Sequence, residues 1–332
     1  MSVVAVAGGL GDVGRTIVEE ILRSKKHKVY ILTRKTTAGS APREYPSHFP
    51  SPVEVDYASV HKITQCLQRL QIDTVISALN LHWAGVSGSQ INLIRGAAAS
   101  GIVARFIPSE FNIDYHAPPE LTMSLCYRYM PYGPRNRFLR AEYELDSHSN
   151  MTYTLVRCGF FMDYLGLPYA VTNLHPLYCL VDVSASKAVI PGDGTNHVVF
   201  THTRDVGKFV TELLSLEATK WPREATISGE RITLNDLVTL TERVIGKQFD
   251  KCHESLENMK ANIVNELPSN RLCYPYFSGD KDELNSVICP QMIGMVSGVF
   301  DIQGIELTKV FPDIGVIRLE DFLSECWNNA VE

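Results

Sequence analysis

Short apolar runs alternate with amphipathic segments over about the first 160 residues of the chain. The runs are rich in β-branched residues and nearly continuous, which is typical of parallel strands covered by helices on both faces. The segments between them place apolar residues at helical spacing. The pattern predicts an α/β fold with a Rossmann-like, doubly wound parallel sheet. Its six expected strands are Val3 to Ala7, Lys28 to Thr33, Val53 to Asp56, Thr74 to Leu79, Ala104 to Ile107 and Thr152 to Val156.

This alternation ends near residue 160, and helical patterns dominate the remainder of the chain. Thr233 stands where one of these helices needs an N-terminal cap, and Gly246 stands where it should end. We therefore expect residues 161–332 to form a smaller, mostly helical lobe interwoven with the main sheet of residues 1–160. The helices expected there are Arg204 to Leu216, Leu234 to Ile245, Leu256 to Asn265 and Leu319 to Asn328.

Composition and charge narrow the classes of function. The 332 residues are 45% hydrophobic and 20% charged, with a formal net charge of −6, so no general field attracts a nucleic-acid backbone. No apolar run approaches the ~18 residues of a membrane span. The eight cysteines show no C-x-x-C spacing, and the histidines show no metal-binding spacing. We expect a cytoplasmic protein with a small-molecule substrate, without metal, nucleic-acid or membrane partners; the oligomeric state stays open.

A glycine-rich turn follows the first expected strand and opens the first helix. It reads Gly8, Gly9, Leu10, Gly11, Asp12, Val13 and Gly14. Glycine at these positions lets the backbone turn tightly and approach a diphosphate, while the helix N-terminus attracts the anion. The strand, turn and helix context is what this motif requires, so the pattern predicts a dinucleotide site rather than a purely structural turn.

The end of the second strand indicates which dinucleotide is bound. An NAD site would offer a carboxylate there, but this chain has Arg34 and Lys35. A guanidinium can pair with a 2′-phosphate, so we expect NADPH and NADP⁺ rather than NADH. Residues 1–160 would then be the NADP-binding domain and residues 161–332 the substrate-binding lobe. By topology alone, Asp56 and Tyr57 should flank the adenine, and Ser77, Ala78 and Leu79 should line the nicotinamide half.

Together with this motif, the segment Ile107-Pro108-Ser109-Glu110-Phe111-Asn112 resembles the NmrA-like, isoflavone-reductase-like branch of the atypical short-chain dehydrogenases, in its fungal secondary-metabolism type. The resemblance covers nearly the whole chain. It implies a Rossmann fold, NADPH, and cofactor contacts from Pro108, Ser109 and Glu110. That family includes reductases of plant phenylpropanoids and isoflavones, fungal secondary-metabolite enzymes, and regulators that bind the dinucleotide without turning it over.

One departure from the family concerns its catalytic lysine. The chain has no lysine between Lys62 and Lys187, and Arg135 falls closest to the expected position. An arginine stays protonated, so it can orient a substrate or stabilise negative charge but cannot transfer a proton. The Tyr-x-x-x-Lys pair of ordinary short-chain dehydrogenases is missing as well.

Other side chains could handle the proton near the carboxyl ends of the strands. Tyr132 and Tyr129 are candidate proton donors or aromatic walls, and His82 is a candidate acid or base. Glu110 or Asp114 could bind a cationic amine. Each also has a plain structural explanation, as a packed tyrosine, a solvated histidine or a loop-bracing carboxylate. The residues expected to contact a flat hydrophobic substrate are Phe111, Phe160, Phe161 and Tyr164.

These features favour an NADPH-dependent reductase that acts in secondary metabolism. Its substrate would be a conjugated, aromatic or alkaloid-like small molecule, reduced at an activated C=C, C=N or benzylic centre. The missing lysine keeps open a redox-neutral cyclase or isomerase that uses bound NADP(H) as a scaffold or hydride shuttle. A third alternative is a non-catalytic regulator that senses NADP(H).

Overall fold

Six parallel strands form the central sheet of the protein, in the order β3-β2-β1-β4-β5-β6. The computed structural model describes residues 1–34, 45–81, 86–116, 134–277 and 279–328. The strand order reverses between β1 and β4, which is the place where doubly wound sheets bind ligands. The strands are β1 (Val3–Ala7), β2 (Lys28–Arg34), β3 (Val53–Val55), β4 (Thr74–Ser77), β5 (Arg105–Ile107) and β6 (Thr152–Tyr153).

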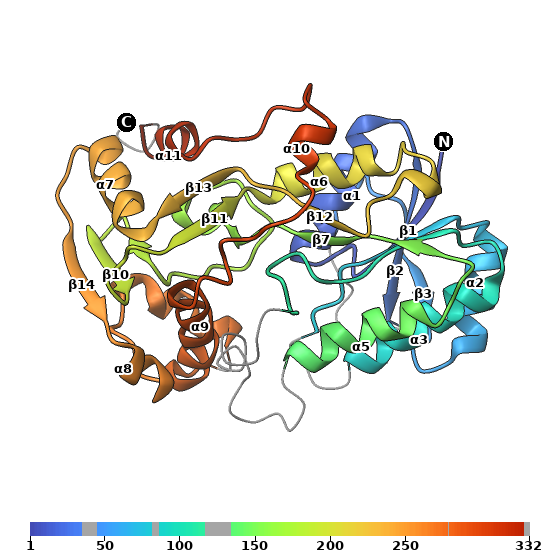
Figure 1. Cartoon of the computed structure of the whole chain (residues 1–332), viewed down its shortest axis with the longest axis horizontal. Helices are drawn as coiled ribbons and strands as arrows, with labels where there is room; N and C mark the ends of the chain where they lie inside the picture. The colour runs from blue at the N-terminus through green and yellow to red at the C-terminus, as the bar shows by residue number, and fades with distance from the viewer. Residues whose placement is uncertain (35–44, 82–85, 117–133, 278, 329–332) are drawn as a thin grey trace.

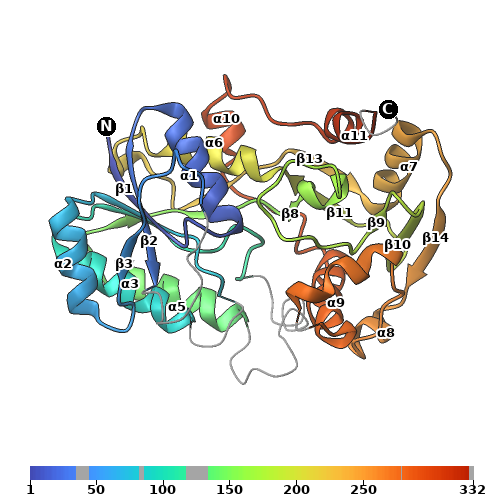
Figure 2. The same ribbon diagram turned by 180° about the vertical axis from the view of Figure 1, so that it is seen from behind.

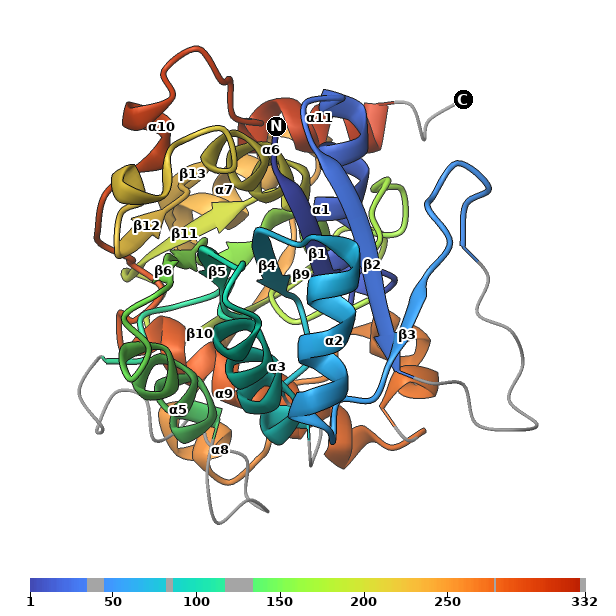
Figure 3. The ribbon, with the colours of Figure 1, turned by 90° about the vertical axis from the view of Figure 1, so that its right-hand side faces the viewer.

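Helices cover both faces of this sheet (Figures 1 and 3). The first layer is α1 (Asp12–Ser24) with α6 (Thr203–Leu213); the second is α2 (Val60–Leu70), α3 (Val86–Ser100) and α5 (Pro134–Asp146). Alternate residues of β1 serve the two layers: Val4 and Val6 pack with α1 and α6, whereas Ala5 and Ala7 pack in the core shared with α2 and α3. Burial on both faces explains why the strands are apolar throughout. The Rossmann-like α/β prediction is confirmed.

The second half of the chain adds small sheets as well as helices, and Figure 2 shows most of them gathered at the end of the molecule away from β3. Three further sheets have the orders β14-β10-β9, β13-β11-β8 and β12-β7. The strands are β7 (Leu155–Arg157), β8 (Phe160–Phe161), β9 (Val181–Asp182), β10 (Lys187–Pro191), β11 (His197–Thr201), β12 (Glu224–Thr226), β13 (Glu230–Thr233) and β14 (Asp250–Glu254). The helices are α7 (Leu234–Ile245), α8 (Leu256–Lys260), α9 (Lys281–Val296), α10 (Leu307–Val310) and α11 (Leu319–Asn328), with short 3₁₀ turns at Met162–Gly166, Ala218–Lys220, Pro268–Leu272 and Tyr274–Tyr276.

The two halves are interwoven. α6 packs on α1, and β12 pairs with β7, so residues 203–226 return to the half of the molecule that holds the central sheet. The expected sixth strand divides at Thr154, whose hydroxyl donates to the carbonyl of Pro222 over 2.6 Å while the chain passes from β6 to β7. None of the helices in the described ranges is long and apolar enough to cross a membrane.

Helix positions in the second half follow local signals closely. α7 and α11 span the predicted residues. Thr233 caps α7 by accepting a hydrogen bond from the backbone N–H of Asp236, and Gly246 ends it in the left-handed conformation. α8 ends at Lys260, earlier than expected, and Asn262 just beyond it has a left-handed φ of 62° that does not continue a helix. The helical lobe also contains the strands β9 to β14, which the sequence pattern did not predict.

Candidate cofactor and active site

The glycine turn after β1 leaves no room for side chains at two positions. Gly8 has φ of 81°, and a Cβ there would lie 2.5 Å from the carbonyl oxygen of Ala78. A Cβ on Gly14 would lie 2.4 Å from the carbonyl oxygen of Gly8. The turn closes with a 3.0 Å hydrogen bond from the N–H of Gly11 to Gly8. Glycine is therefore needed here so that β1, α1 and the end of β4 can approach closely.

The N-terminus of α1 carries backbone donors without acceptors. Gly11 is the N-cap residue and supplies no side chain to the helix. Among the described residues, no acceptor meets the backbone N–H groups of Asp12, Val13 and Gly14, whereas Arg15 N–H bonds to Gly11 at 2.6 Å. Free amides and the helix dipole together form a site for an anion such as a diphosphate.

A cavity of about 660 Å³ extends from this turn across the ends of β2 and β4. Its volume lies within the range typical of small-molecule and cofactor sites. Gly9, Val13 and Gly14 support the turn without lining the cavity, and Val13 packs against the sheet core. The residues that line it are Gly8, Leu10, Gly11, Asp12, Leu32, Thr33, Arg34, Tyr57, Ala78, Leu79, Asn80, Val86, Ser89 and His175.

The β2 end of the cavity carries a cation and an aromatic ring. Arg34 is exposed on the lining, and the described residues provide no carboxylate paired with it. Tyr57 is buried and donates a hydrogen bond to the carbonyl of Leu32 over 3.3 Å; burial raises the pKa of its phenol. Asp56 does not line the cavity and instead forms an ion pair with Lys62 at 2.8 Å. This end therefore favours a phosphate over the two hydroxyls of an NAD ribose. Lys35 lies outside the described residues.

The β4 end of the cavity is mainly apolar. Ala78 and Leu79 line it, together with Val86 and Ser89 at the start of α3. Ser77 is fully buried beneath this wall, and its hydroxyl has no hydrogen-bond partner among the described residues. The expected lining residues after β4 are therefore Ala78 and Leu79, with Ser77 one layer deeper.

The segment after β5 braces this wall rather than lining the cavity. The Ser109 hydroxyl donates to the carbonyl of Leu79 over 2.8 Å, and buried Gln90 accepts from the Ser109 N–H over 3.0 Å. Phe111 has a φ of 31°, a strained value for a side chain of this size, and packs in the core under α1 and α6. Pro108, Ser109 and Glu110 are not among the residues that line the cavity.

Glu110 belongs to a buried ionic cluster around Arg157. Its Oε2 lies 4.0 Å from Arg157 Nε and has no hydrogen bond among the described residues. The guanidinium pairs more closely with Asp114, at 3.0 Å, and with Glu224, at 2.8 Å. Burial, which Arg157 only partly opposes, raises the pKa of Glu110 to about 8. A carboxyl group that is neutral near pH 7 does not suit the recognition of a cationic amine.

The structure does not describe the side chains of the four candidate catalytic residues. Tyr132, Tyr129 and His82 lie outside the described ranges. Arg135 lies in the first turn of α5, but its side chain is not described. Within the described ranges, no three His, Cys, Asp or Glu side chains are arranged to hold a metal ion.

The aromatic residues that follow β7 differ in burial. Phe160 is buried and packs edge-on against Phe200 and Phe300, with ring centroids 6.0 and 6.1 Å apart. Phe161 and Tyr164 are partly buried, with centroids 6.4 Å apart. Burial raises the pKa of Tyr164, and the carboxylates of Asp12 and Asp163 raise it further. Tyr164 is thus close enough to the glycine turn to feel the charge of Asp12.

His175 lines the cavity and was not expected in the site. Its Nδ1 lies 2.7 Å from Asp12 Oδ1, so a residue of the second half contacts the first residue of α1. No sequence pattern could pair these residues, because they are far apart along the chain. The one available signal was the acidic side chain of Asp12 within a phosphate-binding turn.

Comparison with known proteins decides the family. A family model described as NAD(P)H-binding matches residues 8–176. The chain is 36% identical to the oxidoreductase swnN of Metarhizium robertsii over 340 residues, with 98% of each chain covered. The chain belongs to the NmrA-like, isoflavone-reductase-like family of NAD(P)H-binding oxidoreductases.

More distant members of the family are found in plants. The phenylcoumaran benzylic ether reductase TP7 of Nicotiana tabacum is 25% identical and covers 97% of this chain and 97% of its own. The solved complex of leucoanthocyanidin reductase with NADPH from Vitis vinifera has a TM-score of 0.68 at 17% identity, with 97% of this chain and 98% of that chain covered. This structural likeness extends over both halves of the fold.

Proposed function

We propose that this protein is an NADPH-dependent reductase of a conjugated, aromatic or alkaloid-like small molecule in secondary metabolism. The observation that carries the proposal is one cavity that joins the α1 amides to Arg34, groups for which the described residues offer no acceptor and no carboxylate partner. Such a cavity offers donors to a diphosphate at one point and to a 2′-phosphate at another. The names of the plant relatives, which refer to phenylpropanoid-type compounds, support an aromatic substrate.

The roles of cofactor binding and substrate binding would belong to different residues of the chain. When bound, NADPH supplies a hydride to an electrophilic carbon of the substrate. The α1 amides hold the diphosphate, Arg34 holds the 2′-phosphate, and the wall of Ala78 and Leu79 excludes water from the reacting centre. Residues 1–160 would bind the cofactor and residues 161–332 the substrate.

Four residues are candidates for supplying the proton that accompanies the hydride or for stabilising the charge that remains on the substrate. Tyr132, Tyr129 and His82 can exchange a proton, and Arg135 can stabilise the negative charge left on the substrate. Of the aromatic residues expected to contact a flat substrate, Phe161 and Tyr164 are partly buried, whereas Phe111 and Phe160 are buried. Replacing Tyr132 by Phe should lower kcat and leave cofactor affinity unchanged if Tyr132 donates the proton.

The absence of a lysine between Lys62 and Lys187 supports a second candidate, a redox-neutral cyclase or isomerase. Measuring NADPH absorbance near 340 nm and product in the same reaction separates the two. One NADPH consumed per product supports the reductase. Product without net loss of NADPH would contradict it and favour the cyclase or isomerase, and NADP(H) binding without turnover on any substrate offered would favour a sensor.

Arg34 gives the sharpest test of cofactor choice. Arg34→Asp should weaken NADPH binding by at least about tenfold and change NADH binding little, because the new carboxylate repels only the 2′-phosphate. Isothermal titration with both dinucleotides measures this. Lys247→Asp, an equal charge change in an exposed turn after α7, is the control and should alter neither affinity. Equal weakening of NADPH and NADH by Arg34→Asp would contradict the assignment.

A further inference from the structure

A strap of residues 172–175 crosses from the second half of the chain to α1. Asn173 Nδ2 donates to Thr16 Oγ1 and Glu19 Oε2, each over 3.0 Å. His175 then contacts Asp12 at 2.7 Å. The imidazole also meets the ring of Tyr276 edge-on, with centroids 4.8 Å apart. The strap therefore brings one titratable side chain and one aromatic ring to the diphosphate end of the cavity.

The charge of Asp12 is unfavourable for a dinucleotide at this position. Asp12 is the first residue of α1, so its carboxylate stands at the helix N-terminus where the cavity offers its free amides. A carboxylate and a diphosphate repel each other, and the repulsion is strong where water is partly excluded. Arg15, the nearest cation on α1, is already paired with Glu19 at 3.3 Å and lies over the ring of Phe49. His175 Nδ1 lies within ion-pair distance of this carboxylate, 2.7 Å from Asp12 Oδ1.

We propose that His175 is a cofactor-positioning residue: in its protonated form, beside Asp12, it offsets that carboxylate and closes the diphosphate end of the cavity. The inference rests on the proposed function, because it assumes that a phosphorylated dinucleotide binds at α1. It assigns a binding role to the second half of the chain, which the glycine motif alone does not reveal. The role belongs to a side chain that is half exposed, so its removal should leave the fold intact.

The test is a double-mutant cycle on the affinity for NADP⁺, measured by isothermal titration on the full chain. His175→Ala should raise the Kd by about tenfold, since it leaves the Asp12 carboxylate uncompensated beside the diphosphate. Asp12→Asn should leave the Kd unchanged or lower it. In the double variant the loss caused by His175→Ala should disappear, because no carboxylate remains to be offset.

Two further variants separate this charge effect from a structural role of the strap. Asn173→Ala removes the other tether to α1, and we expect a smaller loss of affinity than for His175→Ala, with no rescue by Asp12→Asn. His253→Ala, which removes an exposed histidine bound to the carbonyl of Gly192, is the matched control and should not change the Kd. Losses of equal size in His175→Ala and Asn173→Ala, neither rescued by Asp12→Asn, would overturn the proposal in favour of a structural strap.

Failure of this inference can be told apart from failure of the proposed function. If the unaltered protein does not bind NADP⁺, the dinucleotide site itself is wrong. If it binds NADP⁺ and the cycle shows no coupling, only the role of His175 is wrong. A lower kcat in His175→Ala with an unchanged Kd would also overturn the inference, since it would place His175 in proton transfer instead.

Discussion

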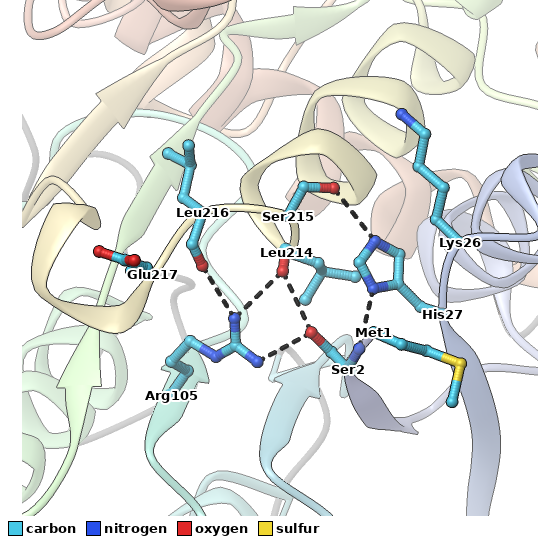
Figure 4. A pocket seen from close by; sticks show the side chains of 9 residues that line it. All are labelled: Met1, Ser2, Lys26, His27, Arg105, Leu214, Ser215, Leu216 and Glu217. Carbon is cyan, nitrogen blue, oxygen red and sulfur yellow. Dashed lines mark hydrogen bonds between the residues drawn. The ribbon is translucent and has the colours of Figure 1, made fainter.

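The two edges of the central sheet both carry a hollow with basic residues, and they differ in whether the polar groups are already bonded. The amino edge holds a pocket of about 370 Å³ at the start of β5, lined in part by Lys26, His27 and Arg105 (Figure 4). Arg105 donates to the carbonyls of Leu214 and Leu216, each over 3.1 Å, to Ser2 Oγ over 2.9 Å and to Asp73 over 2.7 Å. Lys26 is paired with Glu212 at 2.5 Å.

At the carboxyl edge the corresponding groups are free. The first amides of α1 have no acceptor among the described residues, and Arg34 has no described carboxylate partner. At the amino edge, even the imidazole of His27 is hydrogen-bonded, and burial with the surrounding positive charge lowers its pKa. A pocket lined by basic residues can therefore bind an anion only where its hydrogen-bond donors have no partner in the protein. Where those donors are already bonded, they stabilise the fold instead.

The largest effect is expected on NADP⁺ binding at the carboxyl edge of the sheet. Gly14→Ala should weaken NADP⁺ binding by about 100-fold or more, because its Cβ would lie 2.4 Å from the carbonyl oxygen of Gly8 and would push the turn away from α1. Isothermal titration measures the affinity, and thermal unfolding measures the strain in the free protein. We expect the melting temperature to fall as well.

Gly11→Ala is the matched variant. Its Cβ would lie 3.6 Å from the carbonyl oxygen of Gly8, an ordinary contact, and its φ of −100° suits any residue. The melting temperature should therefore stay unchanged, while NADP⁺ binding weakens where the methyl group meets the diphosphate. Normal NADP⁺ affinity in both variants would show that the turn is structural only, and the contrast between the two edges would disappear.

The next effect is on the amino edge and concerns stability. Arg105→Ala should lower the free energy of unfolding by about 3 kcal/mol, because it removes an ion pair from Asp73 and a charged hydrogen-bond donor from the carbonyls of Leu214 and Leu216. Urea unfolding measures this, and the NADP⁺ affinity of the folded variant should stay unchanged. The control is Lys26→Ala, whose exposed ion pair should contribute less than about 1 kcal/mol. Loss of NADP⁺ binding in Arg105→Ala with normal stability would contradict the assignment of this pocket to structure.

The features that the sequence predicted correctly are those with local causes. The glycine turn, β1, and the caps of α7 at Thr233 and Gly246 depend on residues that are neighbours along the chain. The glycine turn and the end of the second expected strand also pointed to the cavity that Gly8, Gly11 and Arg34 line. These signals reflect backbone geometry and short-range hydrogen bonding, which a single sequence contains.

The features that it missed depend on tertiary packing. α9 is buried around most of its circumference and contains Pro290, so it shows no single apolar stripe that would mark a helix. The contact of His175 with Asp12 and the burial of Glu110 beside Arg157 join distant segments. Ser109 and Glu110 do not line the cavity, and their expected contact with the cofactor stays a prediction.

The last expected effect depends on pH and sharpens the comparison along a single strand, because β5 has Arg105 at its amino end and Glu110 just beyond its carboxyl end. The pKa of Glu110 is raised to about 8, so between its ordinary range and about pH 8 the folded protein keeps a proton that the unfolded chain releases. Stability should fall as pH rises through this window, by at most about 1.4 kcal/mol per pH unit. Glu110→Gln imitates the protonated acid and should flatten this decline, leaving the variant more stable than the unaltered protein near pH 8 and similar to it near pH 5.

Urea unfolding of both proteins at the two pH values measures the difference, and Glu224→Gln is the control. Glu224 pairs with the same guanidinium at 2.8 Å but is partly exposed, so its replacement should not stabilise the protein at high pH. If Glu110→Gln were the less stable protein near pH 8, Glu110 would be ionised and paired with Arg157. The charged groups at the carboxyl end of β5 would then be paired, as they are at its amino end. The two edges of the sheet would differ in unpaired polar groups only at α1 and β2.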